Sequence, residues 1–206
     1  MVKEGILEMD EKEMKKTLQG AVFPIVSNGS SCCSGNSCCD DGVSEGDEGP
    51  GEIRVLDIDL LVIDMETCAR CVPTGDQLEA AVTLLSPVAD ALGIELRHRV
   101  IVVQTQEEAK KQALLSSPTI RLNGQDIDQD IRESVCESCG DLTSNNAVID
   151  CREWHYRGKI YFAAPLPMLL EAIMGAMLRI DSLPPVVPTP LERLPENLQR
   201  FFDNKK

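Results

Sequence analysis

The chain has 206 residues, of which 43% are hydrophobic and only 3% aromatic, so aliphatic side chains must fill its core. Its net charge of −14 argues against nucleic acid or an anionic membrane as a partner. No targeting segment is convincing, which predicts a cytoplasmic protein, and the chain has nine cysteines. In that compartment, metal binding or redox chemistry is a better explanation of the thiols than a disulfide framework.

Residues 1–52 are predicted to be a tail rather than part of the core. Residues 8–19 can form a short charged helix, and residues 27–52 are a linker rich in Gly, Ser and acidic residues. Two pairs of adjacent cysteines lie in this flexible linker, at Cys32, Cys33, Cys38 and Cys39. Mobile thiols with no core around them suit chelation of a soft ion, and As(III), Zn²⁺ and Cu(I) all fit. The alternative is that these cysteines are incidental to a low-complexity linker.

The body, predicted over residues 53–181, begins with a strand and a helix. The strand covers 53–64, and the helix covers 72–92 with its apolar residues at helical spacing. The later elements are a strand at 94–103, a short polar helix at 106–115, a strand at 118–124, a hairpin at 154–164 that turns at Arg157–Gly158, and a helix at 166–179. A cysteine-containing insertion occupies residues 125–151. The order β-α-β-α-β-β-α predicts an α/β fold.

Two C-terminal features complete the organisation. Pro165 and Pro167 divide the apolar run at 160–180, so this run predicts a strand and a buried helix rather than a transmembrane helix. Residues 182–206 are predicted to be a Pro-rich extended tail with a short helix at 191–202. We expect this tail to dock on the body.

A Cys-x-x-Cys pair, Cys68 and Cys71, lies between the first strand and the first helix. Unpaired backbone N–H groups and the helix dipole stabilise a thiolate at a helix N-terminus. Cys68 is therefore the predicted nucleophile, with Arg70 adding positive charge, and Cys71 is placed to resolve a mixed disulfide. Zinc sites use the same spacing, so the pair by itself leaves both chemistries open.

The insertion contains a second group of candidate ligands. Cys136, Cys139, Cys151 and His155 have the spacing C-x2-C-x11-C-x3-H, which could hold tetrahedral Zn²⁺, and the three thiolates could hold As(III). Alternatively, Cys136 and Cys139 form a second dithiol that exchanges with the first. A further alternative is a set of buried cysteines with no chemical role.

The stretch SSPTIRLNG at residues 116–124 adds a Ser–Pro step at the start of the third strand. Together with the Cys-x-x-Cys pair, it resembles the thioredoxin-like superfamily over about residues 53–180. The resemblance implies that Pro118 is cis and faces the pair, and that the backbone of Ser117 can pair with a bound substrate strand. The alternative is that Pro118 only begins an edge strand. The chain departs from ordinary thioredoxins because it lacks their Trp-Cys-Gly-Pro-Cys sequence.

Two further segments carry resemblances. CESCG at 136–140 and CREWHYRGKIY at 151–161 are similar to an uncharacterised branch of thioredoxin-like proteins, which implies no established activity. SSCCSGNSCC at 30–39 resembles the N-terminus of arsenite methyltransferases, over about residues 1–42. That resemblance implies capture of trivalent arsenic by the four linker cysteines. The body has no counterpart of the methyltransferase domain, because no strand is followed by a Gly-rich S-adenosylmethionine loop.

These patterns predict a thiol-based protein that handles a thiophilic metalloid or metal. The first hypothesis is a thioredoxin-like oxidoreductase linked to As(III) or organoarsenicals, which acts through Cys68 and Cys71. It needs no cofactor for the dithiol chemistry, and its reductant would be a thioredoxin or a small thiol. The alternative is a non-enzymatic metal-binding protein or metallochaperone. A third hypothesis is a carbon–metal(loid) bond lyase with Asp64 or Glu66 as the proton donor.

Deleting residues 1–52 should leave the fold intact, because we expect few buried contacts to cross the acidic linker. The thermal midpoint of the ion-free protein should change by less than about 2 °C, which corresponds to under ~1 kcal/mol for a domain of this size. Thermal unfolding followed by circular dichroism measures this. A much larger loss of stability would show that the segment belongs to the core.

Overall fold

A four-stranded mixed sheet lies at the centre of the protein. The computed structural model describes residues 54–206, so the predictions for residues 1–52, with Cys32, Cys33, Cys38 and Cys39, lie outside the described residues. The strands of this sheet are β1 (Arg54–Val62), β2 (Ile94–Val102), β3 (Thr119–Leu122) and β4 (Gln125–Asp126), in the order β2-β1-β3-β4. β1 runs parallel to β2 and antiparallel to β3, and β3 runs antiparallel to β4. The predicted α/β class is confirmed.

Strand β1 is buried on one face along most of its length and on both faces at its end. Leu56, Ile58 and Leu60 are fully buried on one face, and the strand ends in a continuous buried run that extends to Ile63. An apolar run of this kind is typical of a parallel strand covered on both sides. Leu60 faces helix α2 near Gly75, where a Cβ atom would lie 2.9 Å from the terminal methyl carbon of Met65, so glycine allows the loop after β1 to pack closely on the helix.

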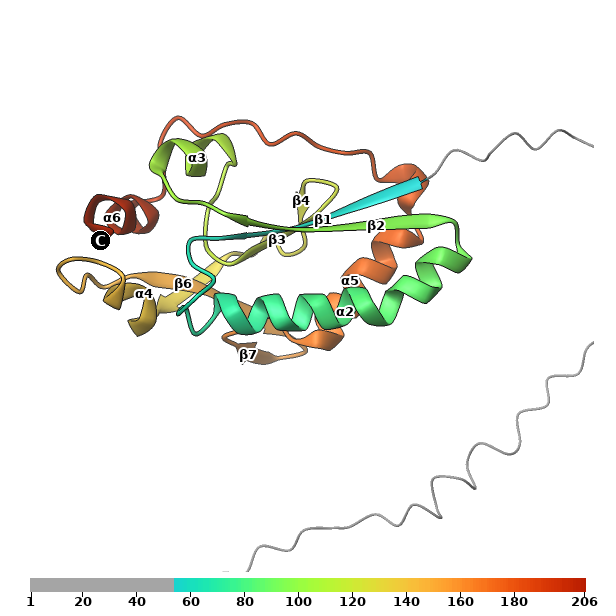
Figure 1. Ribbon diagram of the computed structural model, residues 1–206, viewed down its shortest axis with the longest axis horizontal. Coiled ribbons are helices and arrows are strands. Elements are labelled where there is room, and N and C mark those ends of the chain that lie inside the picture. Colours follow the sequence, from blue (N-terminus) through green and yellow to red (C-terminus); the bar gives the residue numbers. More distant parts are fainter. Residues whose placement is uncertain (1–53) are drawn as a thin grey trace, which may run out of the picture. The chain divides into compact units, whose positions relative to one another are not determined.

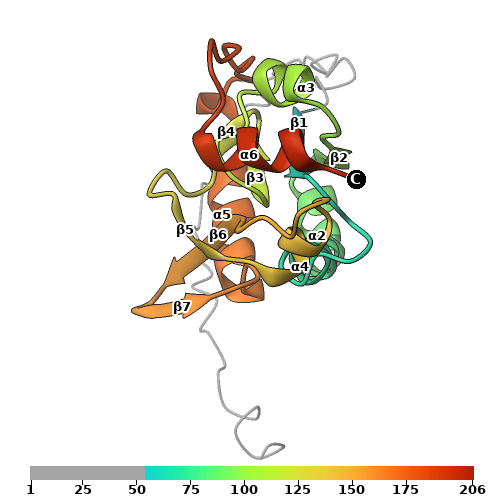
Figure 2. The same ribbon diagram turned by 90° about the vertical axis from the view of Figure 1, so that its left-hand side faces the viewer.

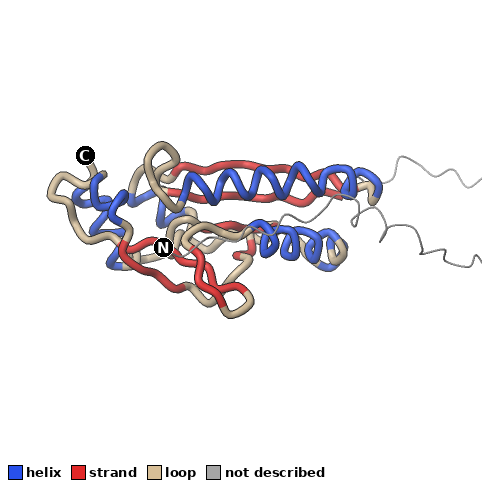
Figure 3. Tube along the Cα trace, turned by 90° about the horizontal axis from the view of Figure 1, so that it is seen from below, coloured by secondary structure: helices blue, strands red, loops and turns tan. Residues whose placement is uncertain are grey.

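Helices cover the two faces of the sheet unequally. Helices α2 (Cys71–Ala91) and α5 (Leu166–Met177) pack against one face, while α3 (Gln106–Lys111) lies on the other (Figure 1). Figure 3 shows α2 and α5 side by side, running along the strands. The hydroxyl of Thr105 caps α3 by accepting from the backbone N–H of Glu108. None of the helices in the described part of the chain is both long and apolar enough to cross a membrane.

A second, three-stranded sheet arises from the insertion and the predicted hairpin. Its antiparallel strands are β5 (Arg132–Val135), β6 (Asp150–Tyr156) and β7 (Lys159–Tyr161), in that order, and the short helix α4 (Glu137–Asp141) follows β5. The hairpin turns at Arg157–Gly158 as predicted, with φ values of 49° and 74°. Figure 2 shows it projecting beside α5.

The predicted order implied that the hairpin supplies the fourth strand of the main sheet, but the hairpin belongs to the second sheet. The fourth strand is β4, which follows β3 directly. Asn123 and Gly124 adopt positive φ values of 48° and 81°, so the chain reverses within two residues and pairs at once. Only glycine fits at position 124, because a Cβ atom there would lie 1.9 Å from the carbonyl oxygen of Val186.

The Pro-rich tail docks on the body, as expected. After the 3-10 turn at Ile180–Ser182, it crosses the sheet face opposite α2 and passes α3 (Figure 1). The backbone N–H of Val186 donates to the Asn123 carbonyl at 2.8 Å, and that of Leu191 donates to the Lys110 carbonyl at 2.9 Å. The chain ends in helix α6 (Glu196–Asn204), where Leu198 and Phe201 are buried.

Helix α6 fastens the insertion. The Asn197 side chain accepts from the Asp150 backbone N–H at 2.9 Å and donates to the Asp150 carbonyl at 2.5 Å. At the end of the helix, the Asn204 carbonyl accepts from the Ser144 N–H at 2.7 Å. The C-terminus therefore holds both ends of the loop between α4 and β6.

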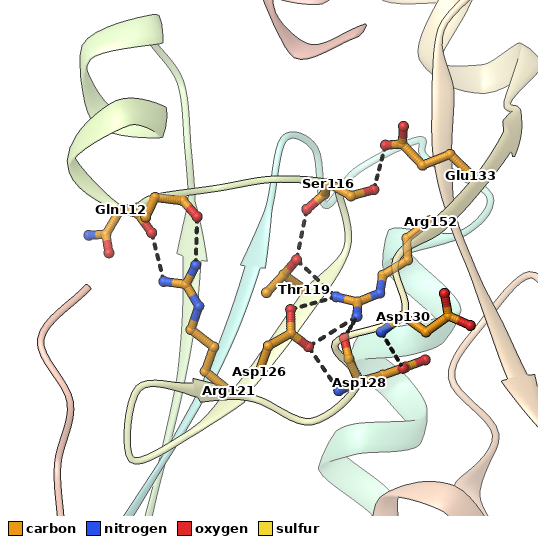
Figure 4. Close-up of polar contacts among 10 residues, drawn as sticks. Gln112, Ser116, Thr119, Arg121, Asp126, Asp128, Asp130, Glu133 and Arg152 are labelled. Atoms are coloured by element: carbon orange, nitrogen blue, oxygen red, sulfur yellow. Dashed lines mark hydrogen bonds and ion pairs between the residues drawn. The ribbon is translucent and has the colours of Figure 1, made fainter. Parts of the chain in front are cut away.

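Arg152 attaches β6 to the main sheet (Figure 4). Its guanidinium group is fully buried and forms two bonds with the Asp126 carboxylate, at 2.8 and 3.0 Å. It also donates to the hydroxyl of Thr119 at 3.2 Å and to the carbonyl of Asp128. The ring of Trp154 lies 4.5 Å from the guanidinium carbon. These bonds fix β6 against β3 and β4.

Replacing Arg152 by Met should destabilise the protein by about 3–5 kcal/mol, because the partly buried Asp126 carboxylate would lose its partner. Arg132→Met is the matched control, because its ion pair with Asp130 is exposed and should contribute less than about 1 kcal/mol. Urea unfolding of both variants measures the difference. Equal losses would mean that the Arg152 network does not hold the second sheet in place.

Candidate metal centre

The loop after β1 presents Cys68 to the interior. One carboxylate oxygen of Asp64 accepts hydrogen bonds from the backbone N–H groups of Glu66, Thr67 and Cys68, at 3.2, 2.8 and 2.7 Å. These bonds wrap the loop around a single side chain, as in an Asx turn. Cys68 is fully buried at the end of the loop, although the preceding residues are exposed.

The Cys-x-x-Cys pair lies at the N-terminus of α2, as predicted. The first helical residue is Cys71, and its backbone N–H donates to the Cys68 sulfur at 3.3 Å. This contact places Cys68 at the positive end of the helix. The Cys71 sulfur lies 3.5 Å from the hydroxyl oxygen of Ser117 and also contacts the Cys68 side chain. Both cysteines are fully buried, and they are not joined in a disulfide.

Four cysteines from three separate segments converge beside this pair. The sulfurs of Cys68 and Cys139 are 3.4 Å apart, and those of Cys139 and Cys151 are 3.1 Å apart. We call Cys68, Cys136, Cys139 and Cys151 the thiol cluster; their four sulfurs lie within 4.8 Å of one another. Four thiolates around Zn²⁺, with bonds of about 2.3 Å, have sulfur–sulfur separations of about 3.8 Å. The cluster could therefore hold one metal ion such as Zn²⁺.

Helix α4 positions two of the four sulfurs. Cys136 is its N-cap residue, and Cys139 lies within its single turn. The backbone N–H of Cys136 donates to the carbonyl of Ile149 at 2.8 Å, which joins the start of α4 to the chain that enters β6. A Cβ atom at position 140 would lie 2.8 Å from the Ala147 carbonyl oxygen, so Gly140 lets the connecting loop close tightly.

Burial and mutual contact determine how the thiols ionise. Hydrogen bonding from Cys136, and then from Cys139 and Cys151, lowers the pKa of Cys68 far below its ordinary value. Contacts with Cys139 and Cys151 lower the pKa of Cys136 to about 6. The pKa values of Cys139 and Cys151 are raised, chiefly by Cys136. Negative charge thus gathers on two of the sulfurs, and a bound cation would replace the protons on the others.

Arg70 donates its hydrogen bonds to β5 and β6 rather than to the thiols. Its guanidinium group, only 5% exposed, donates to the carbonyls of Cys151 and Val135, both at 2.7 Å, and to the Ser134 hydroxyl at 3.0 Å. The sequence predicted that the positive charge of Arg70 would favour the thiolate, and this stays a prediction. Its hydrogen bonds tie β5 and β6 to the start of α2, which brings Cys151 close to Cys68.

The peptide bond between Ser117 and Pro118 is cis, as predicted, and lies beside the pair. The Ser117 hydroxyl accepts from the Ile63 backbone N–H at 3.1 Å. Its carbonyl, part of the backbone that the resemblance assigns to a substrate strand, accepts from the backbone N–H of Arg152 at 2.9 Å. The protein's own strand β6 therefore occupies that position.

His155 lies outside the thiol cluster, and Cys68 takes the place predicted for it. The Nε2 atom of His155 lies 3.0 Å from a carboxylate oxygen of Glu153, and its Nδ1 atom lies 3.4 Å from a guanidinium nitrogen of Arg132. Cys151 and His155 are four residues apart on an extended strand, which separates them by about 13 Å. The predicted spacing would bring them together only in a turn or a helix.

Comparison with known proteins covers the part of the chain that contains the centre. The family model described as Domain of unknown function (DUF2703) matches residues 55–173, which is more than half of the chain. This range includes the whole thiol cluster, Cys71 and Pro118. No curated protein and no solved structure matches the chain.

Asp64→Ala should loosen the loop that carries Cys68, because three backbone N–H groups lose their acceptor. We expect a loss of about 1–2 kcal/mol in the free energy of unfolding. Asp64→Asn is the control, because it keeps one acceptor oxygen in place and should lose less. Chemical denaturation of both variants tests this. Equal stability of wild type and Asp64→Ala would contradict a role in holding the loop.

Proposed function

The chain belongs to the DUF2703 family, and we propose that it binds one thiophilic metal ion through Cys68, Cys136, Cys139 and Cys151. The convergence of four buried sulfurs within 4.8 Å carries this proposal. Thiolates are soft ligands that select ions such as Zn²⁺ over Mg²⁺ or Ca²⁺. The ligands come from the β1–α2 loop, α4 and β6, so a bound ion would cross-link the two sheets.

The number of sulfurs favours a tetrahedral ion over As(III). Zn²⁺ in structural sites takes four ligands, and Cys₄ is among the common sets. As(III) is satisfied by three thiolates and would leave one cluster sulfur without a role. Capture of arsenic by the N-terminal cysteine pairs is a separate hypothesis, which depends on Cys32, Cys33, Cys38 and Cys39.

The surroundings of the cluster suit the net negative charge that a complex of four thiolates and one divalent ion would carry. Four thiolates and one divalent ion have a net charge of −2, which needs donors where water is excluded. The Cys71 N–H supplies one such bond to Cys68, and the Ser138 hydroxyl lies 3.3 Å from the Cys136 sulfur. The buried guanidinium of Arg70, held on the Cys151 carbonyl, adds a positive charge nearby.

A thiol oxidoreductase is the second candidate function, and the Cys68–Cys71 pair favours it. The strand order β2-β1-β3-β4 and the cis Pro118 beside the pair support the thioredoxin-like resemblance. An extended protein substrate would have to displace β6 from the Ser117 carbonyl, so a small substrate fits this candidate better. For a carbon–metal(loid) lyase, Asp64 already accepts three backbone bonds, which leaves the exposed Glu66 as the proton donor.

Zinc titration of the full-length chain tests metal binding. In every variant, Cys32, Cys33, Cys38 and Cys39 are changed to Ser so that only the body reports; we call this the serine background. We expect one Zn²⁺ per chain by native mass spectrometry under reducing conditions. Cys139→Ser should weaken binding by about 100-fold, because one of four ligands contributes roughly a quarter of the ~10–16 kcal/mol typical of structural zinc sites.

The controls separate the thiol cluster from the ligand set predicted by spacing. His155→Ala and Cys71→Ser should each bind zinc as tightly as the serine background, because neither side chain belongs to the cluster. A chelator competition assay gives the affinities. Loss of binding in His155→Ala, or one-to-one binding that survives Cys139→Ser unchanged, would overturn the proposed function.

A further inference from the structure

We infer that oxidation of Cys68 with Cys71 releases the metal ion, so that the centre is a redox-controlled binding site. This inference rests on the proposed function. Its basis is that Cys68 belongs both to the thiol cluster and to the Cys-x-x-Cys pair. A sulfur that forms a disulfide with Cys71 is no longer a thiolate ligand, so one reaction necessarily affects the other.

Cys71 is suited to this role because it stands next to the centre without belonging to it. Among the described cysteines, it is the one outside the thiol cluster. Its sulfur lies 3.5 Å from the hydroxyl oxygen of Ser117 and also contacts the Cys68 side chain, and its backbone N–H already holds the Cys68 sulfur at 3.3 Å. With an ion bound, the other three cluster sulfurs are occupied as ligands, whereas Cys71 keeps a free thiol. Cys-x-x-Cys pairs at a helix start form reversible disulfides readily.

The oxidant we propose is a small hydroperoxide, because a small molecule can reach buried thiols that a protein substrate cannot. The Cys68 thiolate attacks the peroxide, the O–O bond breaks, and Cys68 becomes a sulfenic acid as hydroxide leaves. The Cys71 sulfur then attacks the Cys68 sulfur, the S–O bond breaks, and the Cys71 proton leaves with the oxygen as water. Two electrons pass from the two sulfurs to the peroxide. A small dithiol reverses the change by thiol–disulfide exchange.

Loss of Cys68 leaves the ion with the three sulfurs of the insertion. The remaining ligands all lie on the α4–β6 segment, so the link to the β1–α2 loop is broken. Losing one of four ligands should reduce the affinity by about 100-fold, and a competing chelator then removes the ion.

The test compares zinc release from the serine background and from its Cys71→Ser variant. Both are loaded with one equivalent of Zn²⁺ and exposed to stoichiometric hydrogen peroxide beside a chromogenic zinc chelator. The serine background should release its zinc at least about tenfold faster, because only it can form the Cys68–Cys71 disulfide. Ser at position 71 can keep the hydrogen bond to Ser117, so the fold should be retained. Dithiothreitol should restore binding in the serine background.

Peptide mapping after oxidation identifies the bond that forms. A Cys68–Cys71 disulfide together with faster release supports the inference. Equal release from the two proteins, or a disulfide between Cys139 and Cys151, overturns it while leaving metal binding intact. Failure of both proteins to take up zinc before oxidation would instead overturn the proposed function, so the two failures are distinguishable.

Discussion

The bonds that Arg152 makes with the main sheet determine where the metal centre can form. Its backbone N–H binds the Ser117 carbonyl, and its guanidinium pairs with Asp126 beside β3. Cys151 is the preceding residue on β6, so fixing Arg152 places the Cys151 sulfur at the end of β1. Arg70 then anchors the same strand to the start of α2. The cluster is thus a consequence of how two sheets are joined.

Local patterns in the sequence predicted local structure well. The strand-to-helix position of Cys68, the cis Pro118 and the turn at Arg157–Gly158 each depend on a few adjacent residues. The ligand set depends on contacts between distant segments, and there the spacing misled. Treating Cys151 and His155 as neighbours requires a turn, but both residues lie on the extended strand β6. Trp154 and Tyr156, two aromatic residues at strand spacing, are a signal in the sequence that could have excluded His155, whereas nothing local indicates that Cys68 completes the set.

The docking of β6 also changes what the Cys-x-x-Cys pair can do. A carbonyl that could pair with an incoming strand is already bonded, and both thiols are shielded from water. Burial disfavours thiolates unless another charge offsets them. The insertion brings three more thiols and therefore makes a cation the natural partner of the pair. The docking of β6 therefore both occupies the Ser117 carbonyl and completes the thiol cluster.

Metal binding and thiol oxidation are usually weighed as rival explanations for clustered cysteines. In this chain they are alternative states of one sulfur, because the Cys68 atom that would ligate the ion is also the one nearest to Cys71. An ion bound to Cys68 withdraws electron density from the sulfur and makes it less reactive toward an oxidant, and a disulfide removes the ligand that the ion needs. Each reaction therefore opposes the other through a shared atom, with no conformational relay. Linkage then requires that reducing conditions strengthen metal binding, and that bound metal protects the pair from oxidation to the same extent.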